Sequence, residues 1–337
     1  MLKVKFKKIG IPEKQLDVID DKAKIILKPN EVLTKILIFP INPADILLVE
    51  GKYGNTQQTN IPLGTECVAR VLDTGKRVKN FKINDIVMPL SKNTWVEEKI
   101  VDEEKLIKLP NKIDLKQASM LRVNPASAYL MINNYVKIKQ NDYILQNAAN
   151  SALGQYVIQL CKAYGIKTVN LIRRKEPFNQ LKEIGATKII LNKDIKRNIN
   201  FLKNAKIKLF LDAVGGSDVN IIANLLEQNS TVINYGLLSN SNIEIHPKNT
   251  IFRGVCLKGF WLTQWIAMLK KEEIKNLYSH LSQLILKKKL RANVQKIYFI
   301  KDIKKAVKVA RLYKRSGKIL VTPCIDTLKA LNRKDYK

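Results

Sequence analysis

A tyrosine between two glycines has the surroundings best suited to chemistry in this 337-residue chain. Tyr53 lies in the segment Gly51-Lys52-Tyr53-Gly54, directly after the run 41–50. A phenol is protonated at neutral pH, so it can give a proton or a hydrogen bond to a substrate. We therefore predict that Tyr53 is a catalytic acid, and the sequence leaves open whether it protonates carbon or stabilises an oxyanion. The competing interpretation is an ordinary loop tyrosine with a half-buried ring.

A second candidate element is a strand, a turn of small residues and the start of a helix over 144–155. Such a unit binds the pyrophosphate of a dinucleotide, because free amide N–H groups and the helix dipole meet at the turn. Of the usual glycines only Gly154 remains, and Ala152 would cost about 1 kcal/mol if its φ is positive. Asn150 or Ser151 could instead only cap the helix.

Three basic residues, Arg173, Arg174 and Lys175, follow the next apolar strand. An NAD site has an acidic residue at this position for the ribose 2′-hydroxyl, whereas basic residues suit a 2′-phosphate. The cluster therefore predicts NADPH as the cofactor. The alternative is a solvated run of charge in a basic protein.

The elements that must position these residues fall into two patterns. Short β-type runs broken by turns fill the first third of the chain and predict a compact β-barrel or sandwich. Helical stretches then alternate with apolar strands, which predicts a parallel sheet flanked by helices. The expected β-runs of the first part are 1–7, 23–27, 32–38, 67–72 and 85–88; the expected helices and strands that follow are 118–133, 155–164, 168–172, 188–191, 208–212 and 231–235.

The last part of the chain returns to the first pattern, with an expected strand at 296–300, a helix at 303–313 and a strand at 317–321. We therefore predict an α/β protein in which the nucleotide-binding domain is an insertion. The predicted domains are 1–117 and 118–290, with 291–337 returning to the first. The basic tail 326–337 is expected to be a loosely attached helix or a frayed end.

Lysine and arginine outnumber aspartate and glutamate by 60 to 29, which gives a formal net charge of +31. The basic residues are spread through nearly every segment, whereas nucleic-acid binders usually concentrate them on one face. The spread favours a compositional habit over nucleic-acid binding. A genuine acidic partner, attracted by the long-range field, is the remaining alternative.

No apolar run approaches the roughly 20 residues of a membrane span. The N-terminus lacks the apolar core of a signal peptide, so we expect a cytoplasmic protein, or a mitochondrial one only if a presequence has been removed. The cysteines are too far apart for a pre-organised metal site, so no metal and reduced thiols are expected. The residues concerned are Cys67, Cys161, Cys256, Cys324, His246 and His280.

Six short motifs follow one another along the chain, at 41–45, 64–66, 123–125, 184–186, 212–216 and 259–265. Their order resembles that of the medium-chain dehydrogenases/reductases, and most of all that of the mitochondrial-type trans-2-enoyl thioester (enoyl-acyl-carrier-protein) reductases. The resemblance extends from about Phe39 to Val321. It implies a GroES-like catalytic domain, an inserted Rossmann domain and the zinc-free branch, because Asn42 and Thr65 lie where zinc ligands would be expected.

The resemblance also implies roles for individual residues. Tyr53 resembles the proton donor, and Asn42, Asp45 and Trp261 are candidates for orienting the substrate or the nicotinamide, although the first two could simply fix a turn. Leu237 departs from the usual pattern by replacing a glycine. The residues that match segments around NADPH are Asn124, Asn150, Ser151, Ala152, Leu153, Arg173, Arg174, Lys175, Tyr235, Gly236, Leu237, Leu238, Phe260, Trp261, Leu262, Thr263 and Lys318.

The implied reaction is NADPH-dependent reduction of the C2–C3 double bond of a trans-2-enoyl thioester in fatty acid synthesis, on acyl carrier protein or coenzyme A. Phe260, Trp261 and Trp265 are candidates for an acyl pocket, with plain core the favoured interpretation for Trp265. The resemblance further implies a homodimer. The alternatives are a zinc-independent NADPH quinone or enone reductase and, in another class, an NADPH-binding nucleic-acid-binding protein.

Overall fold

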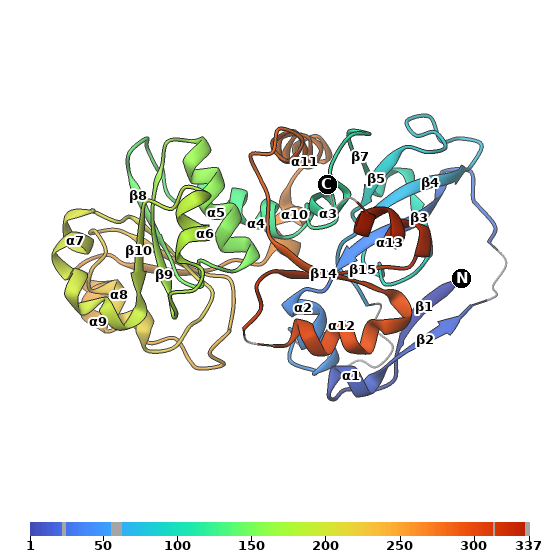
Figure 1. Cartoon of the computed structure of the whole chain (residues 1–337). Coiled ribbons are helices and arrows are strands. Elements are labelled where there is room, and N and C mark those ends of the chain that lie inside the picture. The colour runs from blue at the N-terminus through green and yellow to red at the C-terminus, as the bar shows by residue number, and fades with distance from the viewer. Residues whose placement is uncertain (22–24, 55–62, 313, 334–337) are drawn as a thin grey trace. The chain divides into compact units, whose positions relative to one another are not determined.

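The computed structural model describes residues 1–21, 25–54, 63–312 and 314–333 of the chain. They form two compact units, which Figure 1 shows as ribbons. The first unit consists of Met1–Val123, Lys275–Lys288 and Ala292–Lys337, and the second of Asn124–Ile274 and Lys289–Arg291. The chain thus leaves the first unit after Val123 and returns to it late. None of the helices in the described ranges is long and apolar enough to span a bilayer.

The first unit is built on a seven-stranded sheet. Its long strand β3 (Glu31–Pro40) pairs with three neighbours and changes from alternating burial to complete burial where it enters the centre. The order is β14 (Val294–Phe299), β15 (Lys318–Thr322), β3, β4 (Val68–Thr74), β5 (Ile86–Pro89) and β7 (Leu106–Lys108), with β6 (Glu98–Asp102) also on β3. A separate pair, β1 (Leu2–Phe6) and β2 (Leu16–Asp20), is antiparallel.

Helices connect and cover this sheet. Strands β14 and β15 are parallel, and helix α12 (Ile303–Ala310) connects them, so the returning part of the chain is a βαβ unit. The short η4 (Ile300–Asp302) precedes α12. The other helices of the first unit are α1 (Pro12–Gln15), α2 (Pro43–Val49), η1 (Glu103–Lys105), α3 (Leu115–Ala118), most of α11 (Lys271–Leu286) and α13 (Ile325–Arg333).

Three of the expected elements need correction or completion. Residues 25–27 are not a strand, because Ile26 is 72% exposed and has no core to pack on; residues 23 and 24 lie outside the described ranges. The helix expected over 118–133 is interrupted, and α4 (Asn124–Asn134) begins directly before Pro125, a residue that favours helix starts. The tail helix α13 packs on β14 and β15, and its Leu331 is buried.

The second unit is a six-stranded parallel sheet. Figure 1 shows α5 and α6 on one face and α7, α8 and α9 on the other, which explains why the four central strands are largely buried. The strand order is β10 (Lys188–Leu191), β9 (Lys167–Ile172), β8 (Tyr143–Gln146), β11 (Leu209–Asp212), β12 (Thr231–Asn234) and β13 (Cys256–Gly259). The remaining elements are α5 (Ala152–Ala163), α6 (Phe178–Glu183), η2 (Asn192–Asp194), η3 (Lys196–Asn198), α7 (Ile199–Asn204), α8 (Asp218–Ala223), α9 (Pro247–Ile251) and α10 (Leu262–Met268).

The first strand of this sheet, β8, lies between the second strand β9 and the fourth strand β11. The direction of winding therefore reverses between β8 and β11, which makes this edge a topological switch point. Ligands of doubly wound sheets bind beside the carboxyl ends of the strands at such a point. The predicted α/β fold with an inserted doubly wound domain is confirmed.

Candidate active site

The Tyr53 loop is positioned by helix α2. Pro43 at the start of the helix fixes φ, and the Asp45 carboxylate accepts from the backbone N–H of Asn42 over 2.9 Å. The helix ends at Val49 with Glu50 as its C-cap, and Gly51 directly after the cap has φ 71°; Gly54 after Tyr53 has φ 62°. Since the left-handed region is costly for other residues, both glycines favour this particular course of the loop. Tyr53 is half-buried in it.

A buried polar cluster lies next to the start of α2. The amide of Asn42 donates to Glu66 Oε1 over 2.8 Å and to the Thr65 hydroxyl over 3.2 Å, and its oxygen accepts from the ammonium of Lys318. All but Thr65 are buried. Burial raises the pKa of Glu66, and it lowers the pKa of Lys318 to about 8. Two of the predicted orienting or cofactor residues, Asn42 and Lys318, therefore bond to each other.

Asp45 is the second carboxyl group of this cluster, and its Oδ1 atom is buried without a partner among the described residues. Burial raises the pKa of Asp45 from 3.8 to about 7, against the opposing effects of the Asn42 backbone N–H and Lys318. In water an aspartate would ionise well below neutral pH. Between about pH 4 and about pH 7, Asp45 of the folded chain therefore keeps a proton that the unfolded chain releases.

Asp45→Asn is expected to stabilise the protein at pH values above 7 and to leave stability unchanged below about pH 4. The raised folded pKa makes the parent lose stability as the pH rises from about 4 to about 7, by up to about 4 kcal/mol, and asparagine removes that slope. Thermal unfolding at the two extremes measures the difference. Asp114→Asn, at the exposed cap of α3, should give the same small change at both, and an Asp45→Asn curve parallel to that of the parent would contradict the argument.

The side chains of the same cluster show whether a zinc ion could bind there. The positions expected for zinc ligands hold the Asn42 amide and the Thr65 hydroxyl. The amide donates both to that hydroxyl and to Glu66. Zinc in proteins prefers thiolate and imidazole, so this donor set does not fit the metal. No group of three or more histidine, cysteine, aspartate or glutamate residues suited to a metal occurs within the described ranges.

At the switch point of the second unit, three side chains connect the ends of neighbouring strands. Asn147 after β8 donates to Asp212 Oδ1 over 2.6 Å, and its oxygen accepts from the N–H of Ala213 over 2.7 Å. Asn234 at the end of β12 donates to Asp212 Oδ2 over 2.8 Å. Asp212 also accepts from the N–H groups of Val214 and Gly215. The strand ends are therefore held rigidly where a dinucleotide would bind.

The turn after β8 ends in helix α5, and the strained residue is not the one considered from the sequence. Ala152 is the first helical residue, whereas Ala148 has a φ of 46° and takes the cost of the left-handed region. Ser151 is the cap, accepting from the N–H of Gly154 over 3.1 Å. A Cβ on Gly154 would lie 2.5 Å from the Ala149 oxygen, so only glycine allows this helix to lie so close to the turn.

The predicted cofactor residues of the second unit include some that follow strands and one, Asn124, at the start of α4. Arg173, Arg174 and Lys175 follow β9; Arg174 is half-buried and 3.8 Å from Glu176, and its two neighbours are exposed. The Nδ2 atom of Asn124 and the hydroxyl of Tyr235 are buried without partners among the described residues. Burial raises the pKa of Tyr235, so its hydroxyl stays protonated. Unpaired buried donors are rare, and they fit a polar ligand such as a dinucleotide.

The aromatic segment after β13 divides into exposed and packed residues. Trp261 is 51% exposed, whereas Phe260 is buried and stacks on Trp265 with 6.3 Å between ring centroids. The Trp265 indole donates to the hydroxyl of Tyr135 over 2.9 Å and its ring is half-buried, so the interpretation of Trp265 as plain core stays a prediction. Leu237 and Leu238 are each 52% exposed after β12. Leu262 and Thr263 begin α10, and Trp261 is its cap. The contacts of all these residues with a cofactor stay predictions.

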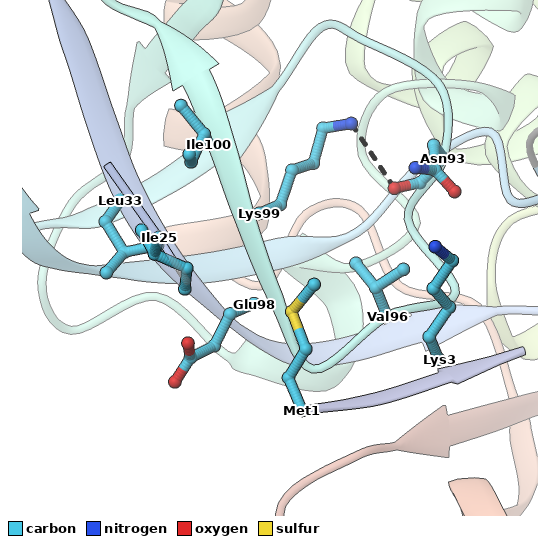
Figure 2. A pocket seen from close by; sticks show the side chains of 9 residues that line it. All are labelled: Met1, Lys3, Ile25, Leu33, Asn93, Val96, Glu98, Lys99 and Ile100. Atoms are coloured by element: carbon cyan, nitrogen blue, oxygen red, sulfur yellow. Dashed lines mark hydrogen bonds between the residues drawn. The ribbon is translucent and has the colours of Figure 1, made fainter. Parts of the chain in front are cut away.

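A surface hollow of the first unit contains none of the predicted site residues. It is lined by residues such as Met1, Leu33 and Lys99, and Figure 2 shows the Lys99 ammonium bonded to the oxygen of Asn93 over 3.3 Å. An ammonium satisfied by the backbone is a structural feature. We assign no chemistry to this hollow.

The sequence analysis did not select Glu66, Asn147, Asp212 or Asn234. Glu66 and Asp212 belong to motifs that were noted for resemblance, and Asp212 ends an apolar strand. A carboxylate directly after a buried strand is a signal that could have identified it, because parallel strands bring such residues to one edge. Nothing local in the sequence pairs Glu66 with Asn42, 24 positions away.

Comparison with known protein families agrees with the two units. The model described as "Alcohol dehydrogenase GroES-like domain" matches residues 28–111, and the one described as "Zinc-binding dehydrogenase" matches residues 152–283. Together with the switch point, they define a medium-chain dehydrogenase/reductase.

Individual relatives narrow the class. The chain is 34% identical to the mitochondrial enoyl-[acyl-carrier-protein] reductase of Dictyostelium discoideum, over 88% of the chain and 87% of the relative. It is 32% identical to the human protein of the same name, over 81% and 78%. The chain belongs to the mitochondrial-type enoyl thioester reductases of the medium-chain dehydrogenase/reductase superfamily.

Solved structures include members of two branches. A Bacillus thuringiensis protein described as a candidate NADPH:quinone reductase has a TM-score of 0.88 and 27% identity, covering 96% of this chain and 99% of its own. The 2-enoyl thioester reductase Etr1p/Etr2p heterodimer of Candida tropicalis has a TM-score of 0.83 and 28% identity, covering 95% and 99%. A complex of Etr1p with NADP and crotonyl-CoA matches with a TM-score of 0.83 and 27% identity, over the same shares of the two chains.

Proposed function

We propose that this protein is an NADPH-dependent trans-2-enoyl thioester reductase of fatty acid synthesis. The observation that carries the proposal is the similarity, over nearly the whole chain, to proteins named enoyl-[acyl-carrier-protein] reductase. The relative solved with NADP and crotonyl-CoA supports both the cofactor and the substrate class. The basic cluster after β9 supports the 2′-phosphate independently of any relative.

Each group of residues has a part in the proposed reaction. NADPH, when bound, supplies a hydride to the β-carbon. The N-terminal amides of α5 and the cap Ser151 would hold the pyrophosphate, and Arg173, Arg174 and Lys175 the 2′-phosphate. Tyr53 would donate its proton to the α-carbon or a hydrogen bond to the thioester oxygen. A donor at that oxygen lowers the barrier because it binds the transition state more tightly than the substrate.

The quinone or enone reductase is the second candidate, favoured by the fold match to the Bacillus thuringiensis protein. The two are separated by comparing NADPH oxidation with crotonyl-CoA and with a simple quinone. The proposal expects a much higher kcat/KM for the thioester, and a higher value for the quinone would contradict it. Acyl-carrier-protein and coenzyme A thioesters of the same acyl group would then identify the carrier. An acidic carrier would suit the net charge of +31.

A homodimer is also part of this proposal. Strand β13 is the end strand of the second unit's sheet and its four residues are exposed, with Leu257 at 45%. Ile251 and Phe252 nearby in sequence are 69% and 75% exposed. An open strand edge beside large apolar side chains favours pairing with a second copy. The relative solved as a heterodimer supports association of this kind.

The expected mass in sedimentation equilibrium is twice the 38.5 kDa of one chain. Leu257→Lys should shift the protein to the monomer, because it buries a charge at the proposed contact. Ile83→Lys, at an exposed apolar position of the first unit, is the matched control and should remain dimeric. A parent protein of 38.5 kDa would contradict the proposal.

The location of the protein stays a proposal as well. The relatives are named as mitochondrial enzymes, and the sequence by itself predicted the cytoplasm. We favour mitochondria, because the relatives of the same family share that location in their names.

A further inference from the structure

Glu66 is a buried carboxylate with no role in the proposed reaction so far. It is 1% exposed, and its two oxygens have different partners. Oε1 accepts from the Asn42 amide over 2.8 Å, and Oε2 accepts from the backbone N–H of Val123 over 2.8 Å. A buried carboxylate needs such donors, because losing them would leave a charge without compensation. Glu66 therefore connects two separate parts of the first unit.

The first of these parts leads to Lys318. The oxygen of Asn42 accepts from the Lys318 ammonium, so the amide lies between a carboxylate and an ammonium. Each bond in such a chain polarises the next, and a low local dielectric strengthens them all. The ammonium has three N–H groups, and Asn42 takes one of them.

The second part is the backbone where the chain leaves the first unit. Val123 is the last residue of that unit, and Asn124 is the first residue of the second. The preceding residue, Arg122, is held by the Tyr278 hydroxyl, which donates to its carbonyl oxygen over 3.1 Å, and by its own bond to Ser91 O over 3.1 Å. Glu66 adds the bond from the backbone N–H of Val123. Hydrogen bonds therefore hold the backbone of both residues directly before Asn124.

We propose that Glu66 is a positioning residue for NADPH binding, which holds Lys318 through Asn42 and the backbone of Val123 directly. This inference rests on the proposed function, since Glu66 would act through Lys318 and Asn124, two of the predicted cofactor residues. Glu66 itself touches neither the cofactor nor the reacting atoms in this scheme.

The charges around Lys318 predict how a substitution of Glu66 would change the pKa of Lys318. Burial lowers the pKa of Lys318 to about 8, Glu66 and Asp45 oppose the shift, and Arg315 adds to it. Arg122 is the further cation that acts on Glu66. Removing the charge of Glu66 would lower the Lys318 pKa further, so the ammonium would lose its proton closer to neutral pH.

The test is a titration of NADPH binding by fluorescence over a range of pH, with no thioester present. Glu66→Gln places an amide N–H against one of the two donors. It is expected to weaken binding about tenfold or more near neutral pH. The pH at which binding falls should also move downward by about one unit. Glu103→Gln is the matched control, because Glu103 also accepts from backbone N–H groups, at an exposed turn of the first unit, and it should bind like the parent.

A double-mutant cycle distinguishes positioning from general support. Lys318→Met should remove the loss of NADPH binding at alkaline pH. Adding Glu66→Gln to it should weaken binding by clearly less than the roughly tenfold expected in the parent, because only the part of the effect that runs through Val123 remains. Fully additive effects would overturn the inference. If Glu66→Gln does not fold, Asn42→Ala breaks the same connection between Glu66 and Lys318. It should likewise lower the pH at which NADPH binding falls.

Different results would refute the role of Glu66 and the proposed enzymatic activity. A parent that binds NADPH but does not reduce crotonyl-CoA refutes the function and leaves the binding test intact. A Glu66→Gln variant that binds NADPH as tightly as the parent, and loses binding at the same pH, refutes the inference and leaves the function. A parent that binds no NADPH refutes both.

Discussion

Tyr53→Phe is expected to lower kcat for crotonyl-CoA reduction by about a hundredfold or more, because a positioned general acid contributes on the order of 10² to 10⁴ to a rate. Phenylalanine keeps the ring and removes only the hydroxyl, so the half-buried packing of the loop is retained. The glycines on either side, at φ 71° and 62°, should keep the loop in the same course. Affinity for NADPH should stay within about twofold, since the hydroxyl is assigned to the transition state.

Steady-state kinetics and NADPH titration of the same preparations measure the two quantities. Tyr298→Phe is the matched control, since it removes a hydroxyl from another partly buried tyrosine of the first unit. It should retain the parent rate. A Tyr53→Phe enzyme with an unchanged kcat would remove the assigned acid from the mechanism, and an enzyme with only a raised KM would make Tyr53 a binding residue.

The second large effect is expected from the basic cluster. Arg173→Ser combined with Arg174→Ser should weaken NADPH binding by about 10² to 10⁴, because each charge-assisted bond to a phosphate contributes roughly 1.5 to 3 kcal/mol. Affinity for NADH should change little, since NADH lacks the 2′-phosphate. The preference for NADPH over NADH should therefore largely disappear.

Competition between the two nucleotides, measured as the ratio of their dissociation constants, gives the result directly. Arg197→Ser is the control, because Arg197 is a highly exposed arginine of the same unit, paired with Asp194. It should leave the ratio unchanged. If the double variant binds both nucleotides as the parent does, the two arginines are a solvated surface and do not hold the 2′-phosphate.

The second unit was predictable from the sequence because its signals are local. Strands such as 168–172 and 188–191 are short apolar runs between helical stretches, and they lie within one residue of β9 and β10. Local patterns also identified the turn after β8 and the basic cluster after β9, because a doubly wound sheet orders its strand ends by topology alone.

What the sequence did not predict depends on contacts between distant residues. The strain of the turn falls on Ala148 and not on Ala152, since the helix begins at residue 152 after the Ser151 cap. The cluster around Glu66 joins β15 to the start of α2, positions separated by 276 residues, and no periodicity encodes such a pair. For the apolar run 23–27 the sequence predicted too much. Its hydrophobicity suggested a strand, but residues 25–27 pair with no neighbouring strand.

The most direct test of the central claim follows the hydrogen atoms of one turnover. With NADPH deuterated at C4 of the nicotinamide and crotonyl-CoA in ordinary water, mass spectrometry should find the deuterium on C3 of butyryl-CoA; with ordinary NADPH in deuterium oxide, it should find deuterium on C2. NADPH oxidation that leaves crotonyl-CoA intact, or deuterium from the cofactor at C2, would contradict the account.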